Sequence, residues 1–123
     1  MYNPFSLDGK TILITGASSG IGRAIAVECS RMGAKVVITA RNEARLQETL
    51  SMMSGDGHRK VCADLDSEES IINLVEGLPA LNGVVHNAGI GDRSLCKTVK
   101  KDDIMRVIST NFGGPALLQK YLL

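Results

Sequence analysis

Apolar residues along this chain alternate between short continuous runs and a wider, helical spacing. The continuous runs predict strands at residues 11–15, 36–39, 60–63 and 83–86, because each is short and the first two are rich in β-branched side chains. Between and after these runs, apolar side chains recur every three or four residues, which predicts helices with one buried face. Those faces contain Ile21, Ala24, Ile25, Cys29 and Met32, then Leu46, Leu50 and Met53, then Ile71, Leu74, Val75 and Leu78, and finally Ile104, Val107 and Ile108.

Each predicted strand is followed by a predicted helix, and this order indicates the fold class. Strands joined through helices pair in parallel, which predicts an α/β fold. We expect a Rossmann-like, doubly wound parallel sheet in strand order 3-2-1-4, with helices on both faces in three αβα layers. The ligand crevice of such a sheet lies at the carboxyl ends of strands 1 and 4. The length of 123 residues fits a single domain, residues 1–123.

Several residues predict where helices begin, end or bend. Gly33 is typical of the C-terminal end of a helix. Asp66, with Glu69 three residues later, predicts a capping box at the start of the third helix. The last helix is expected to run over residues 101–122, and Pro115 is expected to bend it or loosen it locally.

The segment between the first strand and the first helix reads Thr15-Gly16-Ala17-Ser18-Ser19-Gly20-Ile21-Gly22. Unpaired backbone N–H groups and the helix dipole make such a segment suitable for binding a pyrophosphate. Gly16 is expected to allow a sharp turn, Gly20 a close approach of backbone to phosphate, and Gly22 close packing of the helix on the sheet. Ser18 and Ser19 add hydroxyl donors. The alternative is a plain tight turn in which the glycines serve geometry alone.

The residues at the end of the second strand, Thr39-Ala40-Arg41-Asn42, bear on the choice of cofactor. A protein that binds NAD places an acid there, on the ribose 2′-hydroxyl. This chain has Arg41 instead, whose guanidinium can bind a 2′-phosphate through two parallel hydrogen bonds. The nearest acid, Glu43, lies beyond the strand end. The sequence therefore predicts a preference for NADP(H) over NAD(H). The alternative is that Arg41 is a solvated residue at the start of a helix.

Composition excludes several other classes of function. The net charge of +1 and the scattered basic residues provide no field that would recruit nucleic acid or a membrane. An aromatic content of 3% provides no stacking platform for single-stranded nucleic acid. The 3 cysteines and 2 histidines have no metal-ligand spacing, which predicts no metal site. Separated cysteines, odd in number, also indicate a reducing, cytoplasmic environment.

Four short motifs make the sequence resemble the short-chain dehydrogenase/reductase family over essentially the whole chain. They are the loop from Thr15 to Gly22, Ala63-Asp64-Leu65 after the third strand, Asn87-Ala88-Gly89 after the fourth, and Asn111 in the last helix. The chain departs from the family at His86, where the family has the first of two asparagines. The resemblance implies that the cofactor-binding residues are Gly16, Ser18, Ser19, Gly20, Ile21, Gly22, Arg41, Asp64, Leu65, Asn87, Ala88 and Gly89.

Two of these motif residues have an implied role and a plainer alternative. The resemblance implies that Asp64 contacts the adenine amino group, whereas the alternative is that it caps a turn. It also implies that Asn111 joins a catalytic tetrad and helps hold a water in a proton relay. The helical spacing places Asn111 on an apolar face turned towards the sheet, where its amide must find partners. The alternative is that Asn111 only bonds a neighbouring backbone carbonyl.

The resemblance implies an NADP(H)-dependent oxidoreductase that interconverts a small-molecule carbonyl and an alcohol, and a homo-oligomer joined through the last helix. The family's serine and its Tyr-x-x-x-Lys pair are expected beyond Leu123, because Tyr2 is followed four residues later by Ser6 and Tyr121 by the end of the chain. We therefore expect the 123-residue chain to be inactive alone, with its fourth strand an exposed edge that favours self-association. A non-catalytic dinucleotide-binding or regulatory module is the alternative, and a structural or nucleic-acid-binding domain fits less well.

Overall fold

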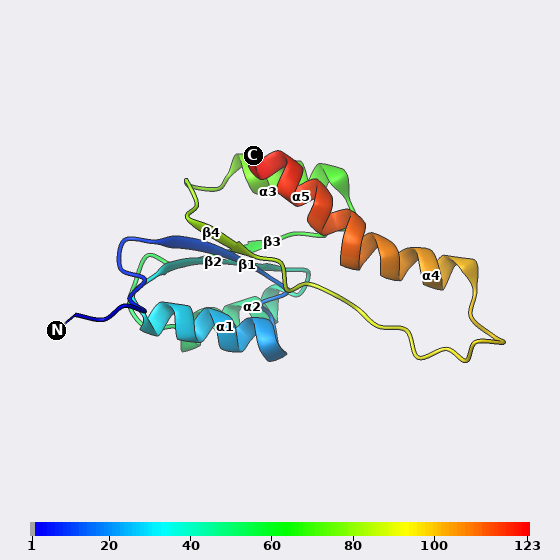
Figure 1. The fold of residues 1–123 in the computed structure, drawn as a ribbon, viewed down its shortest axis with the longest axis horizontal. Coiled ribbons are helices and arrows are strands. Elements are labelled where there is room, and N and C mark those ends of the chain that lie inside the picture. Colours follow the sequence, from blue (N-terminus) through cyan, green and yellow to red (C-terminus); the bar gives the residue numbers. More distant parts are fainter. Residues whose placement is uncertain (1) are drawn as a thin grey trace. The chain divides into compact units, whose positions relative to one another are not determined.

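The computed structural model describes residues 2–123, which form two compact units. The first unit comprises residues 2–63 and 78–87, and the second comprises residues 64–77 and 88–123. The prediction of a single domain over residues 1–123 stays a prediction. Figure 1 shows the elements of both units, which are described separately below.

The first unit is built on a parallel sheet of four strands in the order β3-β2-β1-β4. The strands are β1 (Thr11–Thr15), β2 (Lys35–Ala40), β3 (Arg59–Cys62) and β4 (Gly83–Val85). Two helices, α1 (Gly20–Arg31) and α2 (Glu43–Met52), lie side by side on one face of this sheet (Figure 1). The predicted parallel pairing and the Rossmann-like strand order 3-2-1-4 are therefore confirmed, with strand ends shifted by one residue at β2, β3 and β4.

The core of the first unit lies between the sheet and these two helices. Alternate residues of β1 and β2 supply Ile14, Val36 and Ile38, and each is fully buried. Ala26 from α1 and Leu46 from α2 complete the same cluster. Because neighbouring side chains of a strand point to opposite faces, this alternation fixes which side of the sheet the helices cover.

Local interactions at the ends of α1 and α2 explain their boundaries. Gly33 has a φ of 100°, so a residue without a β-carbon ends α1 as predicted. The side chain of Asn42 accepts a hydrogen bond from the Arg45 N–H at 3.0 Å and starts α2.

The β4 strand pairs only with β1 among the described strands, so it lies at one edge of the sheet, and its three residues are half-buried.

The regular elements that the structure describes in the second unit are all helices, and residues 88–100 form a loop without helix or strand. It contains α3 (Glu68–Glu76), α4 (Lys101–Ile108), the π-helical segment η1 (Ser109–Gly113) and α5 (Gly114–Leu122). The α3 helix packs against α5, and the buried side chains of the two helices are Ile71, Leu74 and Leu118. None of the helices in residues 2–123 is both long enough and apolar enough to cross a membrane.

The predicted capping box at the start of α3 is wrong. Ser67, not Asp66, is the N-cap, and its hydroxyl accepts a hydrogen bond from the Ser70 N–H at 3.2 Å. The Asp66 carboxylate instead accepts hydrogen bonds from the hydroxyls of Ser109 at 3.1 Å and Thr110 at 2.8 Å. These two hydroxyls lie more than 40 residues further along the chain, so local sequence spacing gave no sign of them.

The last helix is continuous but contains a π-helical segment where the sequence predicted a local loosening. The N–H of Gly114 bonds to the carbonyl of Ser109, five residues earlier, and Pro115 follows directly. Proline has no N–H to donate, and its ring crowds the carbonyl four residues before it, here that of Asn111. A wider helical turn relieves that crowding, which gives Pro115 a structural role.

Candidate functional site

The loop between β1 and α1 turns on glycine residues. Gly16 has a φ of 64° and Gly20 a φ of 57°, a region that strongly favours glycine. The expected sharp turn at Gly16 is therefore present. A β-carbon on Gly20 would have no neighbour within 4 Å, so the space beside this residue is open.

Asn87 closes one side of this loop. Its N–H donates to the Thr15 hydroxyl at 3.0 Å, and its side-chain amide donates to the Gly16 carbonyl at 3.2 Å. Asn87 follows β4 by two residues, and β4 pairs in parallel with β1, so the carboxyl ends of both strands meet at the loop. Thr15 itself is fully buried, and its hydroxyl also lies 3.4 Å from the Val85 carbonyl.

Gly22 lies in the first turn of α1 and faces the same contacts. A β-carbon at this position would clash with the carbonyl oxygen of Gly16 and would stand 2.5 Å from the side-chain nitrogen of Asn87. Real β-carbons do not approach other atoms so closely. The close packing predicted for Gly22 is thus a contact with the loop and with Asn87.

The N-terminus of α1 has no side-chain cap among the described residues. Ser19 occupies the N-cap position with an extended backbone, but its hydroxyl makes no capping hydrogen bond. The first turn also exposes Ile21, which is 73% accessible, so the prediction that it lies on the buried face of this helix is wrong. An uncapped helix start presents N–H groups and the positive end of the dipole, which together suit an anion.

Arg41 follows β2 directly and is exposed. Its carbonyl accepts a hydrogen bond from the Cys62 thiol at 3.1 Å, but no side chain in residues 2–123 bonds its guanidinium. The nearest acid, Glu43, forms an ion pair with Lys60. A positive charge without a carboxylate partner therefore stands at the carboxyl end of β2.

Two residues that the sequence did not single out hold the loop from the side of α2. The Arg23 guanidinium donates to the Ser18 carbonyl at 2.7 Å, and the Thr49 hydroxyl donates to the Ala17 carbonyl at 2.8 Å. Arg23 lies on α1 and Thr49 on α2, 26 residues apart, so no spacing rule connects them. Thr15, which precedes the first glycine of the motif, was within reach of the sequence and was not assigned a role.

In the second unit, Asp64 stands in a turn and has the plainer role that the sequence left open. Its carboxylate accepts the Asp66 N–H at 2.9 Å, and its own N–H donates to the Ser70 hydroxyl at 2.9 Å. Leu65 is buried, and its carbonyl lies 2.5 Å from the position of a β-carbon on Gly114. Asp64 remains exposed, so its turn geometry leaves the carboxylate accessible.

Asn111 lies in η1 and binds one residue through both ends of its amide. It donates to the Ile90 carbonyl at 2.8 Å and accepts the Ile90 N–H at 2.8 Å. The expectation that this amide must find partners is confirmed, and the partner is backbone. These two hydrogen bonds hold the backbone at Ile90, which directly follows the half-buried Ala88 and the exposed Gly89. The prediction that Ile104, Val107 and Ile108 form a buried face is wrong: no residue of α4 is buried, and Ile104 is 45% and Ile108 48% exposed.

The described residues contain no group of three histidine, cysteine or acidic side chains placed to hold a metal ion.

Tyr121, the tyrosine near the end of the chain, donates its hydroxyl to Glu68 at 2.7 Å. That hydrogen bond to Glu68 is the main cause that raises the pKa of Tyr121. A tyrosine that acts as a proton donor near neutral pH needs its pKa lowered, so this environment is the opposite of a catalytic one.

A parallel sheet in the order 3-2-1-4, with a glycine loop leading into the first helix, defines the Rossmann-like class of dinucleotide-binding proteins. Within that class, the chain belongs to the short-chain dehydrogenase family, whose profile matches residues 10–123. Membership supports a nicotinamide dinucleotide as the cofactor.

Individual relatives agree with this assignment. The chain is 38% identical over 125 residues to a 3-oxoacyl-(acyl-carrier-protein) reductase of Pseudomonas aeruginosa, covering 96% of this chain and 50% of the relative. It is 34% identical over 120 residues to an uncharacterized oxidoreductase of Thermotoga maritima, covering 94% and 48%. The chain therefore spans about half the length of the curated relatives it matches.

Solved structures support the same family assignment. A 3-ketoacyl-(acyl-carrier-protein) reductase from Brucella melitensis, in complex with NADH, superimposes with a TM-score of 0.90 at 33% identity, covering 96% of this chain and 50% of that one. A short-chain dehydrogenase from Escherichia coli CFT073, in complex with NADPH, gives a TM-score of 0.89 at 30% identity, covering 98% and 55%. Since one complex holds NADH and the other NADPH, these likenesses leave the choice between the two cofactors open.

Proposed function

We propose that the chain provides the cofactor-binding part of an NADP(H)-dependent oxidoreductase that interconverts carbonyls and alcohols. The observation that carries this proposal is the geometry of the glycine loop. Asn87 donates to the Gly16 carbonyl, Gly22 leaves room for that contact, and the start of α1 beside the loop has no side-chain cap. A bound nicotinamide supplies hydride to a carbonyl carbon or accepts it from an alcohol carbon. The residues of this chain bind and orient that cofactor.

The pyrophosphate is the part of the cofactor that the loop suits best. The N–H groups of the first turn of α1, with the hydroxyls of Ser18 and Ser19, would donate to its oxygens. Gly20 leaves open space where a β-carbon would otherwise stand. The exposed Ile21 would cover apolar surface of the ligand.

Arg41 would bind the 2′-phosphate that distinguishes NADP(H) from NAD(H). Its guanidinium is exposed, and Glu43, the nearest acid, is already paired with Lys60. A charge-assisted hydrogen bond contributes about 1.5 to 3 kcal/mol. That free energy corresponds to a preference for NADP(H) of roughly tenfold to a hundredfold.

The remaining motif residues have proposed roles at the other parts of the cofactor. Asp64 would accept from the adenine amino group with the carboxylate that its turn leaves exposed, and Leu65 would pack beside the adenine. The backbone of residues 87–89 would run along the cofactor, because Ala88 and Gly89 add almost no side chain there. Asn111, through Ile90, would hold that backbone in place and contribute to the proton relay.

Calorimetric titration of NADPH and NADH into the chain tests the cofactor proposal. We expect NADPH to bind at least tenfold more tightly than NADH, and Arg41→Ala to abolish this difference. Arg31→Ala is the matched control, since it removes the same charge from the far end of α1 and should leave the preference intact. Equal binding of the two cofactors by the wild-type chain would overturn the assignment of Arg41.

For the whole protein we propose a small-molecule carbonyl substrate and a cytoplasmic location, which the free thiols of Cys29, Cys62 and Cys96 support. The 123-residue chain alone should not turn over substrate, because neither Tyr2 nor Tyr121 has a lysine four residues later. Loss of NADPH absorbance with a panel of ketones and aldehydes is the measurement. Carbonyl-dependent oxidation by the purified chain would contradict the proposal.

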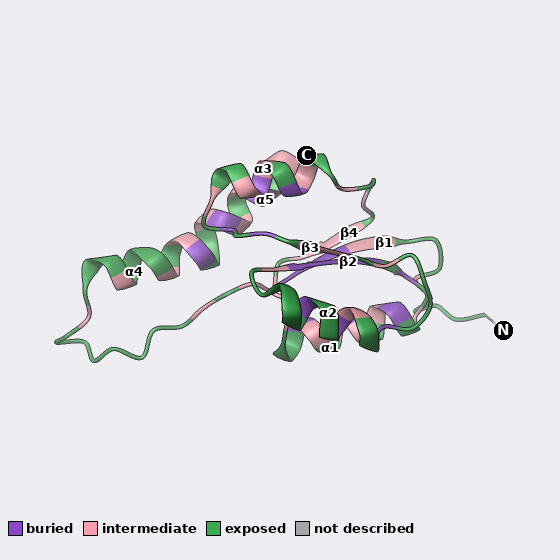
Figure 2. Cartoon of the chain, turned by 180° about the vertical axis from the view of Figure 1, so that it is seen from behind, coloured by how far each residue is buried: buried purple, intermediate pink, exposed green. Residues whose placement is uncertain are grey.

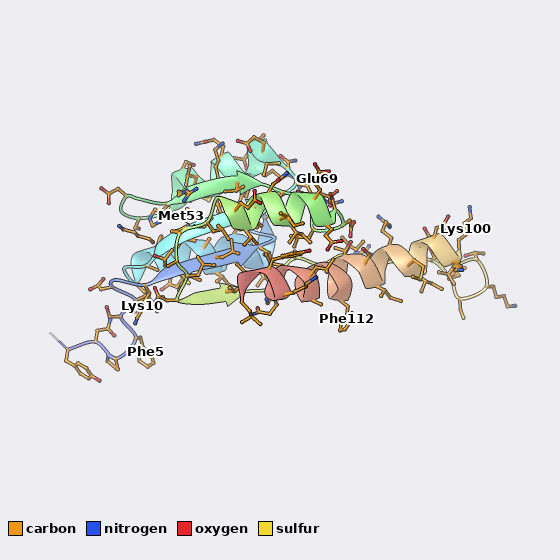
Figure 3. All side chains as sticks on the ribbon, turned by 90° about the horizontal axis from the view of Figure 1, so that it is seen from above. Phe5, Lys10, Met53, Glu69, Lys100 and Phe112 are labelled. Carbon is orange, nitrogen blue, oxygen red and sulfur yellow. The ribbon has the colours of Figure 1, made fainter. Side chains whose placement is uncertain are left out.

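We further propose that two copies of the chain associate through α4. Figure 2 shows that most of α4 is exposed, and Ile104, Met105 and Ile108 are each about half exposed. Phe112, which follows α4 in η1, is 72% exposed and projects from the helix (Figure 3). Single exposed apolar side chains are common, but four within nine residues form a patch that favours association. Light scattering should give a mass above that of the monomer, and the double variant Ile104→Lys, Ile108→Lys should give a monomer.

A further inference from the structure

Arg23 and Thr49 form a hydrogen-bonded pair behind the glycine loop. The Arg23 Nε donates to the Thr49 hydroxyl at 2.9 Å, while its Nη2 donates to the Ser18 carbonyl at 2.7 Å. The same Nη2 lies 3.2 Å from the Arg45 carbonyl and 3.0 Å from the Glu48 carboxylate. One guanidinium therefore joins α1, the loop and α2.

The Thr49 hydroxyl also forms a hydrogen bond to a second carbonyl of the loop. It accepts from Arg23, and its own hydrogen goes to the Ala17 carbonyl at 2.8 Å, the shorter of its two acceptor distances. Thr49 is fully buried, and so is Ala17. The N–H of Ala17 donates to the Thr39 carbonyl at 3.3 Å, so both polar groups of Ala17 are held.

These contacts orient the peptide groups that follow Ala17 and Ser18. In a trans peptide, the carbonyl of one residue and the N–H of the next point in opposite directions. The Ala17 carbonyl points to Thr49, so the Ser18 N–H points away from α2. The Ser18 carbonyl points to Arg23, so the Ser19 N–H points away from that side as well.

We propose that Arg23 and Thr49 are positioning residues for the dinucleotide pyrophosphate, setting the direction of the Ser18 and Ser19 N–H groups without contacting the ligand. The inference rests on the proposed function, because it assigns to the loop the ligand argued above. Preorganised N–H donors bind an anion more tightly than donors that must first reorient. Loss of either residue therefore weakens pyrophosphate binding.

The effect comes from orientation and not from the charge of Arg23. Its guanidinium is paired with Glu48, and the Arg23 side chain is 23% exposed. A lysine would keep the charge but has no planar fork, so it cannot reach Ser18, Thr49 and α2 together. Arg23→Lys is thus expected to lose affinity, although an interaction of charge alone would be preserved.

Calorimetric titration of NADPH into three variants of the chain tests the inference. Thr49→Val keeps the side-chain volume and removes the hydroxyl, and we expect it to raise the dissociation constant at least tenfold. Arg23→Lys should raise it severalfold, and Thr49→Ser, which restores a hydroxyl, should stay within about threefold of wild type. A rescue by Thr49→Ser is a result that packing alone would not produce.

Ser30→Ala provides the matched control for general loss of stability. The Ser30 hydroxyl also ties α1 to the chain after α2, donating to Val27 at 2.6 Å and accepting from the Ser54 N–H at 2.9 Å, but at the far end of the helix. Thermal denaturation without ligand gives the stability of each variant, and Ser30→Ala should keep wild-type affinity for NADPH.

The possible outcomes separate the two claims. If the wild-type chain binds no dinucleotide, the proposed function fails and the inference falls with it. If the wild-type chain binds and Thr49→Val binds equally well, the function stands and the inference is wrong. Equal losses in Thr49→Val and Ser30→Ala would also overturn it, because they would indicate stability and not orientation. Should Thr49→Val not fold, equal affinity in Arg23→Lys and wild type would reject the inference.

Discussion

The side-chain nitrogen of Asn87 lies 2.5 Å from the position that a β-carbon on Gly22 would occupy. The amide of Asn87, the start of α1 and the glycine loop therefore share one space, and only a residue without a side chain at position 22 leaves room for it. The Gly16 carbonyl, to which Asn87 donates, is closer still to that position.

Gly22→Ala should separate α1 from Asn87 and destabilise the chain. Overpacking of this kind costs about 1 to 3 kcal/mol, and the displaced loop should also bind dinucleotide more weakly. Gly20→Ala is the comparison, since its β-carbon meets nothing and its positive φ alone costs about 1 kcal/mol. Urea denaturation measures both, and a smaller loss of stability in Gly22→Ala than in Gly20→Ala would contradict this account.

Thr15 and Thr39 are register partners across β1 and β2, yet opposite effects are expected when their hydroxyls are removed. Both are buried, but the Thr15 hydroxyl accepts the Asn87 N–H, whereas the Thr39 hydroxyl has no partner among residues 2–123. Thr15→Val should lower the free energy of unfolding by about 1 to 3 kcal/mol, because a donor is left unpaired. Thr39→Val should be neutral or raise it by about 1 kcal/mol. Chemical denaturation of the two variants decides, and a large loss in Thr39→Val would show that its hydroxyl has a role.

Asp66 should couple to Thr110 and not to Glu69. A double-mutant cycle of Asp66→Ala and Thr110→Val should give an interaction free energy of about 1 kcal/mol, because the carboxylate accepts the Thr110 hydroxyl. The same cycle with Glu69→Ala should give a value near zero. A coupling between Asp66 and Glu69 would restore the capping box that the sequence predicted.

The pKa of Tyr121 should fall towards its ordinary value in Glu68→Gln. Its hydroxyl donates to the Glu68 carboxylate, and that bond, followed by desolvation and the negative charge of Glu68, raises the pKa. Because the folded-state pKa is raised, the contribution to stability is present below the unfolded pKa and is lost as the pH rises through the folded one. Absorbance of tyrosinate during alkaline titration of the wild-type chain and of Glu68→Gln measures the shift. An unchanged titration in Glu68→Gln would remove Glu68 as the cause.

The sequence determined the elements and the order of the sheet, since apolar period and strand–helix alternation are properties of neighbouring residues. It also determined the glycine loop, because positive φ at Gly16 and Gly20 restricts the residue type locally. The turn at Gly33 and the loosening before Pro115 were predictable for the same reason. Each of these rests on a constraint that one residue and its neighbours carry by themselves.

Only the tertiary structure decided which distant groups meet. Asp66 reaches Thr110, Thr49 reaches Ala17, and Asn111 reaches Ile90, and in each case at least 20 residues lie between the partners. Hydrogen-bonding side chains have many acceptors available in an unfolded chain, so their partners are chosen by packing. The capping box failed because a carboxylate suited to a helix start found hydroxyls elsewhere. The glycines that suit the loop to an anion are visible in the sequence. The orientation of the loop's peptide groups depends on helices that only the fold brings behind it.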